Sequence, residues 1–257
     1  MKAREIADII EAFAPLSTQE SWDNAGFCIG SPETEVKGVL VGFDCTPELI
    51  EEAVERGANM VVTHHPLIFR GVKKISPDTF LGSAITRAIQ NGIVVYAAHT
   101  NADKAVQGVN DLMADRLGLV NRSPLSEEGI GLVGEMPQPM DAHELIAFVK
   151  RQFNLKMLRS SRPESGLIRK VALCSGSGGS FIENAYAAGA DAYISGDISY
   201  HDFFTEKGLL LMDIGHYESE IAIVEKFKSL LDAELLKKTT TFAVLSSKKN
   251  NNPIYYF

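Results

Sequence analysis

The sequence predicts an α/β protein with two similar α/β lobes, each built on a mainly parallel sheet, and a small inserted α/β segment. Three observations lead to this fold class. Short apolar runs alternate with helical patterns over residues 36–98 and again from residue 170, as in strands joined by crossover helices. These two alternating stretches resemble each other. The length of 257 residues leaves room for one large domain or two small ones.

The first lobe is expected to cover residues 1–117. Apolar residues recur at helical spacing over 4–13, and the run at 36–43 is apolar and rich in β-branched residues, which predicts a buried strand. Thr46 and Pro47 predict a helix start, because Thr favours the N-cap and Pro favours the first helical position. The other expected elements of this lobe are strands at 60–63 and 93–98 and a helix at 79–90.

The rest of the chain is expected to form a small inserted segment, 118–169, and a second lobe, 170–257. Asp141 and Glu144 have the spacing of a capping box and predict a helix that runs to about residue 153. The alternating pattern then returns. It predicts strands at 170–174, 191–194 and 209–213, helices at 180–188, 200–206 and 217–235, and one more strand in the tail.

The two lobes carry an internal repeat. Residues 51–65 align without a gap on residues 183–197. In each lobe, a histidine after the next predicted strand is followed four residues later by a carboxylate. We therefore expect the lobes to superpose. The expected equivalent pairs are His99 with His216 and Asp103 with Glu220.

Composition and charge argue against several classes of protein. Apolar residues make up 45% and charged residues 23% of the chain, as in ordinary globular domains. The net charge of −8 does not support binding to nucleic acid or to an anionic membrane through overall charge. The 3 cysteines are far apart and form no CxxC, which predicts a reducing compartment and no cysteine zinc site. Without a signal-peptide pattern or an apolar run near the ~20 residues of a membrane span, a soluble cytoplasmic protein is expected.

Histidines and carboxylates stand at the ends of predicted strands. His64 and His65 follow a buried strand, and adjacent side chains of an extended segment point to opposite sides. This pair therefore suits two neighbouring metal ions, each taking one imidazole; a polar loop is the alternative. The further candidates are His99 and Asp103 in HTNAD and His216 and Glu220 in GHYESE. Imidazoles with carboxylates suit Zn, Fe, Mn or a similar divalent ion.

A glycine-rich turn, CSGSGGSF, follows the strand at 170–174. The backbone N–H groups of Gly176 and Gly178 are candidates to hold a phosphate. The turn has no P-loop lysine, and a tight turn without a ligand is the alternative. The remaining candidates are Trp22, Asp23 and Asn24 for a substrate pocket and Asp44 and His201 for proton transfer. His143, at a helix start, is expected to be a surface residue.

Together these motifs resemble the GTP cyclohydrolase 1 type 2 family (the Nif-three-like, dinuclear-metal family) in its short form. The resemblance covers essentially the whole chain and rests on SWDNAGFCIG, THHPLIF, HTNAD, CSGSGGSF, SGD and GHYESE, in that order. It implies a toroidal homohexamer of two-lobed subunits with a dinuclear metal site between the lobes. It implies two divalent metal ions per chain, with Glu220 as the bridging ligand and His99 as a further ligand or a neighbour of the ligands. The implied ligand set is His64, His65, Asp103, His216 and Glu220.

The family name implies a metal-dependent hydrolase of a nucleotide or phosphorylated small molecule. In the reaction that the name describes, water opens the imidazole ring of a purine and releases C8 as formate. Two neighbouring ions suit such chemistry because they activate water and neutralise charge on the substrate. The alternative is a metal-binding regulatory or interaction protein without catalysis, acting through partners or nucleic acid, although the net charge of −8 does not support nucleic acid.

Overall fold

Two sheets organise the chain, one in each of two units. Unit 1 comprises Met1–Ala105 with Ile223–Pro253, and unit 2 comprises Val106–Ala222 with the residues from Ile254 onward. The chain thus enters unit 2 before residue 117 and returns to unit 1 in its last long helix, so the division differs from the three consecutive segments predicted. The computed structural model describes residues 1–164, 166–206, 208–238, 242–249 and 252–256.

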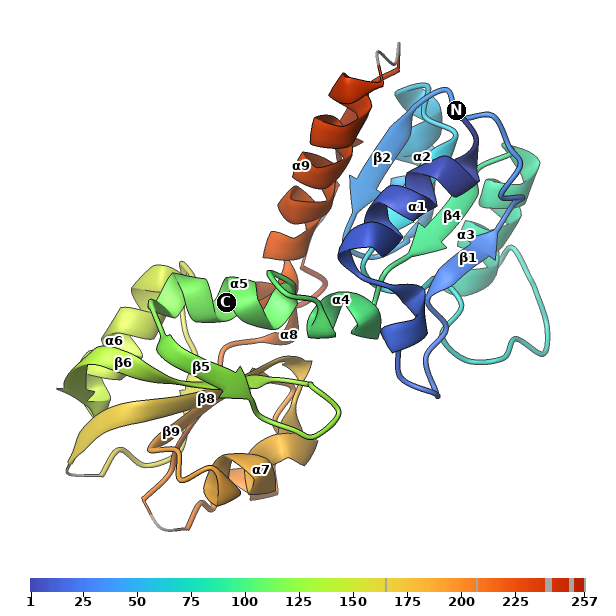
Figure 1. Ribbon diagram of the computed structural model, residues 1–257. Helices are drawn as coiled ribbons and strands as arrows, with labels where there is room; N and C mark the ends of the chain where they lie inside the picture. The colour runs from blue at the N-terminus through green and yellow to red at the C-terminus, as the bar shows by residue number, and fades with distance from the viewer. Residues whose placement is uncertain (165, 207, 239–241, 250–251, 257) are drawn as a thin grey trace. The chain divides into compact units, whose positions relative to one another are not determined.

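Unit 1 contains a five-stranded sheet with the strand order β1-β4-β3-β2-β11 (Figure 1). The strands β2, β3, β4 and β11 are parallel, and β1 is antiparallel to β4. Every residue of β2, β3 and β4 is buried, as expected for parallel strands covered on both faces. The bounds are β1 Gly26–Ile29, β2 Val39–Gly42, β3 Met60–Thr63, β4 Val94–Ala97 and β11 Val244–Ser246.

Helices cover both faces of this sheet. Figure 1 shows α1 in front of the sheet and α2 and α3 behind it. The Thr46 side chain accepts a hydrogen bond from the Leu49 N–H at the start of α2, and Ile50 and Ile85 pack from α2 and α3 into one core cluster. Both the N-cap and the helix predicted there are confirmed. The helices are α1 Ala3–Phe13, η1 Leu16–Thr18, α2 Pro47–Glu55, α3 Phe80–Gln90, α4 Thr100–Lys104 and α9 Ala222–Lys237.

A buried carboxylate ties α2 to the segment that follows β11. Glu52 is 3% exposed. It accepts hydrogen bonds from Ser247 Oγ at 2.5 Å and from the Lys248 N–H at 2.9 Å, and it pairs with Arg56 at 2.6 Å. Burial raises the pKa of Glu52, but these hydrogen bonds and the ion pair outweigh that effect and lower the pKa below its ordinary value of 4.5.

Replacing Glu52 with alanine is expected to destabilise the protein by about 2 kcal/mol at pH 7, because buried donors lose their acceptor. A pKa lowered by folding means that the stabilisation is present above pH 4.5 and is lost as the pH falls through the folded-state pKa. Urea unfolding at pH 7 and at low pH checks this. The gap between Glu52→Ala and wild type should shrink on acidification, and an equal gap at both pH values would refute the role of the charged carboxylate.

Unit 2 contains a six-stranded sheet with the order β5-β6-β8-β9-β10-β7. Only the centre of this sheet is parallel. The strands β8, β9 and β10 are parallel to one another, whereas β5, β6 and β7 each pair with their neighbours in the antiparallel direction. The prediction of a mainly parallel sheet is wrong here, because the predicted inserted segment contributes the β5–β6 hairpin to this sheet and hairpin strands are antiparallel. The bounds are β5 Val120–Pro124, β6 Leu132–Asp141, β7 Arg159–Ser160, β8 Leu167–Ser177, β9 Ala192–Gly196 and β10 Leu210–Asp213.

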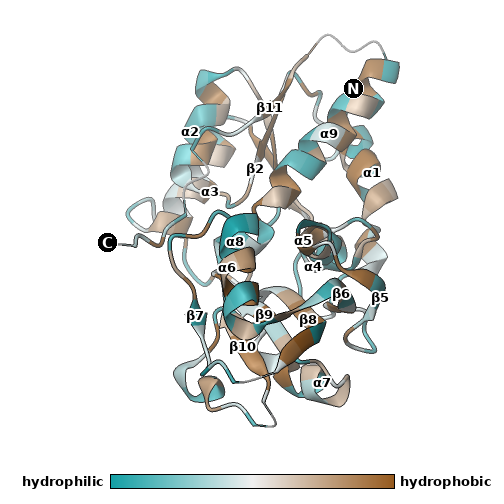
Figure 2. Ribbon diagram, turned by 90° about the vertical axis from the view of Figure 1, so that its left-hand side faces the viewer, coloured by the Kyte–Doolittle hydropathy of each residue, from teal (hydrophilic) through white to brown (hydrophobic). Residues whose placement is uncertain are grey.

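The core of unit 2 lies on both faces of this sheet. Neighbouring residues alternate between the faces: Leu173 and Ile194 pack with α5 and α6, whereas Tyr193 packs with α7. The apolar β8 and β9 lie among the helices in Figure 2. The capping box between Asp141 and Glu144 is present at the start of α6. The helices are α5 Val109–Leu117, α6 Ala142–Gln152, η2 Gly179–Phe181, α7 Ile182–Ala187, η3 Tyr200–Phe203 and α8 His216–Glu220.

The internal repeat is visible in the two sheets. β3 lies between the parallel strands β2 and β4, and β9 lies between the parallel strands β8 and β10. The register pairs Thr63 with Ala97 in one sheet and Ser195 with Asp213 in the other. Counted from these pairs, His99 is equivalent to Gly215, so the predicted equivalence with His216 is wrong by one residue.

The predicted helix at 217–235 is two helices. α8 ends at Glu220 and α9 begins at Ala222, at the place where the chain passes from unit 2 back to unit 1. Within the described residues, no helix combines the length and the apolar composition that a membrane crossing requires.

Candidate metal centre

Three imidazoles converge in unit 1, where the chain leaves β3 and β4. His64 and His65 follow β3, and His99 follows β4. Their ring centroids lie 4.9, 5.3 and 5.4 Å apart. One potential ligand nitrogen from each ring lies within 4.8 Å of the others. Because β3 and β4 are parallel neighbours, their carboxyl ends deliver these rings to the same edge of the sheet.

The neighbouring histidines do not point apart as predicted. The chain bends at residues 64 and 65 directly after β3, so the rule for an extended segment does not apply. Thr63 Oγ1 donates a hydrogen bond to the His65 carbonyl at 2.8 Å, and Phe43 lies against both imidazoles, with centroid distances of 5.8 and 4.7 Å. The bend thus brings both rings to one cluster.

Four histidines that are candidates for metal binding share one feature: Nδ1 faces an oxygen. The contacts are His64 to Ala98 O at 2.9 Å, His65 to Asp44 Oδ1 at 2.7 Å, His99 to Asp23 Oδ1 at 2.7 Å and, in unit 2, His216 to Asp197 Oδ2 at 2.7 Å. An acceptor at Nδ1 favours the tautomer with its hydrogen there, so Nε2 carries the lone pair that a metal takes. Carboxylate and carbonyl partners of this kind orient metal-binding histidines.

Both carboxylate oxygens of Asp23 are held by contacts with His99 and Thr100. Its second oxygen accepts hydrogen bonds from the Thr100 N–H at 3.1 Å and from Thr100 Oγ1 at 2.5 Å. Burial raises the pKa of Asp23, but the hydrogen bonds with His99 and Thr100 lower it to about 2. Asp23 is therefore charged at neutral pH, and its contacts give it the role of orienting His99.

Asp103 brings a carboxylate of unit 1 to the Nε2 side of the imidazole cluster. Its Oδ1 is 3.7 Å from His64 Nε2. The helix α4, which carries Asp103, is fixed by Asn101: the Asn101 side chain accepts a hydrogen bond from the His99 N–H and donates one to the Ala14 carbonyl. Sequence reasoning did not select Asn101, although it lies within the HTNAD motif.

In unit 2, His216 and Glu220 form a second potential ligand pair. Both lie on α8, and His216 Nε2 is 3.1 Å from Glu220 Oε2, because residues four apart share one helix face. Glu220 is 4% exposed. The chain passes so close to this carboxylate at Gly176 that a Cβ there would lie 2.2 Å from Glu220 Oε1. Gly176 also has φ +59, a conformation that glycine adopts readily.

These contacts correct the phosphate interpretation of the glycine-rich turn. The Gly176 N–H donates to Ser219 Oγ at 2.9 Å, and the Gly178 N–H donates to Ser195 Oγ at 3.1 Å. Both N–H groups are thus engaged within unit 2. The glycines are explained by the close approach of the chain to Glu220 and Ser195.

Asp197 is a functional candidate that sequence reasoning missed. It adopts φ +51, which is uncommon for residues other than glycine but accessible to aspartate. In this conformation its carboxylate reaches His216 Nδ1. The SGD motif at the end of β9 was the available signal, but only the fold brings Asp197 to a histidine 19 positions later.

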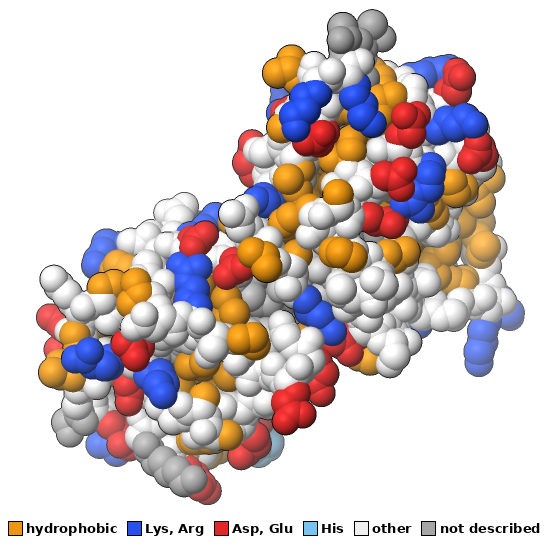
Figure 3. All heavy atoms as spheres, in the orientation of Figure 1, with side chains coloured by type: hydrophobic (Ala, Val, Ile, Leu, Met, Phe, Trp, Pro, Cys, Tyr) orange, Lys and Arg blue, Asp and Glu red, His pale blue; other side chains and the backbone are white. Residues whose placement is uncertain are grey.

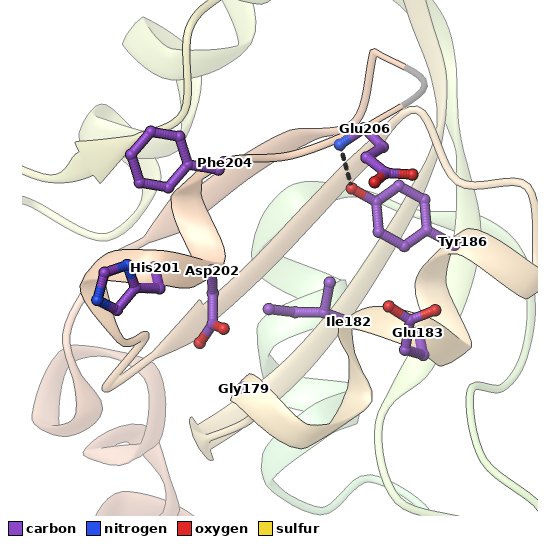
Figure 4. Close-up of a pocket in the computed structure, with 8 residues that line it drawn as sticks. All are labelled: Gly179, Ile182, Glu183, Tyr186, His201, Asp202, Phe204 and Glu206. Carbon is purple, nitrogen blue, oxygen red and sulfur yellow. Dashed lines mark hydrogen bonds between the residues drawn. The ribbon is translucent and has the colours of Figure 1, made fainter.

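His201 lies in a different setting from the other histidine candidates. It lines a cavity of about 390 Å³ in unit 2, between η3 and α7 (Figure 4). Among the described residues, His201 belongs to none of the groups of three that are close enough to share a metal. Carboxylates dominate the polar lining, which disfavours an anionic substrate. The lining is Gly179, Ile182, Glu183, Tyr186, His201, Asp202, Phe204 and Glu206.

The donor chemistry fits a divalent ion. Imidazoles with an oriented Nε2, accompanied by carboxylates, are ligands that Zn, Fe and Mn accept. The fold and the site thus define an α/β protein with histidine and carboxylate groups that can bind a metal.

Comparison with known proteins gives the family. The model of the Duf34/NIF3 (NGG1p interacting factor 3) family matches residues 1–253, and the chain belongs to this family. A Clostridium perfringens protein named GTP cyclohydrolase 1 type 2 homolog is 40% identical over 247 residues, covering 91% of this chain and 94% of that protein. A Clostridium acetobutylicum protein of the same name is 37% identical, covering 98% of each chain. A crystal structure of a Staphylococcus aureus hypothetical protein matches with a TM-score of 0.90 at 30% identity, covering 100% of this chain and 99% of that one.

Proposed function

We propose that this protein binds two divalent metal ions per chain and uses them to hydrolyse a nucleotide or a related phosphorylated compound. One observation carries the proposal: four histidines at strand ends each present Nδ1 to an oxygen. Three of those oxygens belong to carboxylates. Histidines on an ordinary surface have no need of such partners, whereas metal-binding histidines almost always have them.

As the family resemblance implies, the proposed ligands would hold two ions in one dinuclear centre, with Glu220 as the candidate bridge and His99 as a further ligand or neighbour. Two bound divalent ions would supply a water nucleophile at neutral pH and neutralise charge that develops on the substrate. The chain's own aspartates Asp44, Asp23 and Asp197 hold the imidazoles in place and fix their tautomers. The proposed ligands are His64, His65, Asp103, His216 and Glu220.

The reaction class is proposed from the names of the relatives. Proteins 37% and 40% identical to this chain are named GTP cyclohydrolase 1 type 2 homologs. In that class of reaction, water adds to C8 of a purine and the imidazole ring opens to a formamide, and a second water hydrolyses the formamide and releases C8 as formate. Figure 3 shows acidic and basic side chains interspersed on the visible face, which together with the net charge of −8 favours a small molecule over nucleic acid.

An activity screen tests this proposal. Protein loaded with Zn²⁺, Mn²⁺ or Fe²⁺ is incubated with GTP and other nucleotides, and formate and phosphate are assayed separately. We expect metal-dependent release of one of these products. Absence of both products from every nucleotide, with the metals confirmed present, would reject the hydrolase and favour the regulatory metal-binding protein.

Asp44→Asn is expected to weaken metal binding about 10- to 100-fold, as loss of a partner that orients a metal ligand typically does. The amide can no longer act as a charged acceptor at His65 Nδ1, which Asp44 now contacts at 2.7 Å. Competition with a chelating dye measures the affinity. Asp8→Asn, a change at an exposed carboxylate that pairs with Arg4, is the matched control and should bind metal as wild type does; equal affinities in both variants would remove Asp44 from the site.

The oligomer is also a proposal. The family resemblance implies a toroidal homohexamer, and multi-angle light scattering of the purified protein should give the mass of six chains. A monomer at micromolar concentration would contradict it.

A further inference from the structure

An exposed aromatic pair lies beside the imidazole cluster of unit 1. Trp22 is 58% exposed and Phe69 is 45% exposed. Their ring centroids lie 5.8 Å apart at an interplanar angle of 78°. Both rings also meet His99 edge to face, at 6.4 Å for Trp22 and 5.9 Å for Phe69. The three rings therefore form one aromatic surface that starts in solvent and ends at the proposed metal ligands.

The two aromatic side chains sit on loops that the fold holds in place. Asn24 Nδ2 donates a hydrogen bond to the Ile68 carbonyl at 2.6 Å and so joins the loop of Trp22 to the loop of Phe69. Asp23, next to Trp22, contacts His99 and Thr100. A surface that is already ordered loses less conformational entropy when a ligand binds.

A group of cations begins directly after Phe69. Arg70, Lys73 and Lys74 are all exposed, and none of them takes part in an ion pair among the described residues. In a chain with a net charge of −8, three cations within five residues create a local attraction for an anionic group.

We propose that Trp22 and Phe69 stack on a planar heteroaromatic ring and that Arg70, Lys73 and Lys74 contact a phosphate attached to that ring through a sugar. The ligand class is a mononucleotide. The assignment deepens the proposed function and rests on it for the reaction, although binding requires no turnover. It places the ring, and not the phosphate, beside His99, so the bond to be hydrolysed belongs to the base.

Intrinsic fluorescence tests the stacking, because Trp22 is the only tryptophan in the sequence. The metal-loaded protein is titrated with guanosine monophosphate, with guanosine as the probe without phosphate and with ribose 5-phosphate as the probe without a ring. We expect saturable quenching by guanosine monophosphate, weaker binding of guanosine, and no quenching by ribose 5-phosphate. Quenching by ribose 5-phosphate, or none by guanosine monophosphate, would overturn the proposal.

Variants separate the two parts of the surface. Phe69→Ala should weaken binding of guanosine monophosphate about tenfold, the scale of one base–aromatic stack, and Phe69→Tyr should restore it. Phe80→Ala is the matched control, since Phe80 is 65% exposed in the same unit and makes no ring contact with Trp22 among the described residues. The triple variant R70A/K73A/K74A should weaken binding of guanosine monophosphate about tenfold and leave guanosine unchanged. Unaltered binding by Phe69→Ala would refute the stacking.

The failure of this proposal can be told from the failure of the proposed function. Saturable quenching without release of formate or phosphate would retain the nucleotide surface and reject the hydrolase. Product release without a change in fluorescence, and undiminished in Phe69→Ala, would retain the hydrolase and reject the surface.

Discussion

Glu220→Ala is expected to remove most of the bound metal, leaving less than one ion per chain instead of the two proposed for wild type. Glu220 is the proposed bridge, so its loss should weaken the binding of both ions, whereas loss of any other ligand should weaken the binding of one. Its burial at 4% exposure and its 3.1 Å contact with His216 Nε2 place it where an imidazole is already oriented. Elemental analysis after gel filtration measures the stoichiometry.

His143→Ala is the control for this measurement. His143 is exposed at the start of α6 and belongs to no group of three potential ligands among the described residues, so its metal content should equal that of wild type. Wild-type metal content in Glu220→Ala would exclude Glu220 as a bridge. A wild-type protein without metal at neutral pH, where the imidazoles are available, would count against the whole centre.

His65→Ala is expected to lower metal-dependent hydrolysis by about 10³-fold, on the scale of losing one group that stabilises the transition state. His65 is a ligand candidate of unit 1 whose Nδ1 contacts Asp44 and whose ring lies against Phe43. We expect the variant to keep the fold, since His65 follows β3 and contributes to none of its ladder pairs.

Rates of formate and phosphate release, measured at saturating metal, check the expectation for His65→Ala. The saturating metal separates a loss of catalysis from a simple loss of affinity. His143→Ala again provides the control and should retain the wild-type rate. A His65→Ala enzyme with wild-type turnover would show that the hydrolysis takes place elsewhere on the chain.

Local patterns were sufficient to predict the elements that carry the site. The strand Met60–Thr63 and the cap at Thr46 follow from β-branched runs and N-cap chemistry that lie within a few residues. The ligand candidates were found for a related reason: polar residues directly after buried strands stand out against their surroundings. His64, His65 and His99 are such residues, and the structure brings their rings together.

The periodicity of the sequence does not predict contacts between residues that lie far apart along the chain. Asp44 lies 21 positions from His65, and Asp23 lies 76 positions from His99; only the folded sheet joins them, so sequence reasoning gave these aspartates to proton transfer and to a substrate pocket. The sequence suggested that Gly176 belongs to a phosphate-binding turn. A glycine that is needed for close packing against another side chain cannot be distinguished in sequence from a glycine that binds a ligand. The structure distinguishes the two by the position of Glu220.

Anomalous diffraction from crystals of the metal-loaded protein tests the central claim most directly, namely that the proposed ligands hold two neighbouring metal ions. Data collected on either side of the absorption edge of the bound metal locate each ion without reference to the coordinates. We expect two neighbouring peaks per chain, with Glu220 touching both and with imidazole Nε2 atoms of His64, His65 and His216 as ligands. Peaks confined to the imidazoles of unit 1, or no peak beside Glu220, would contradict the claim.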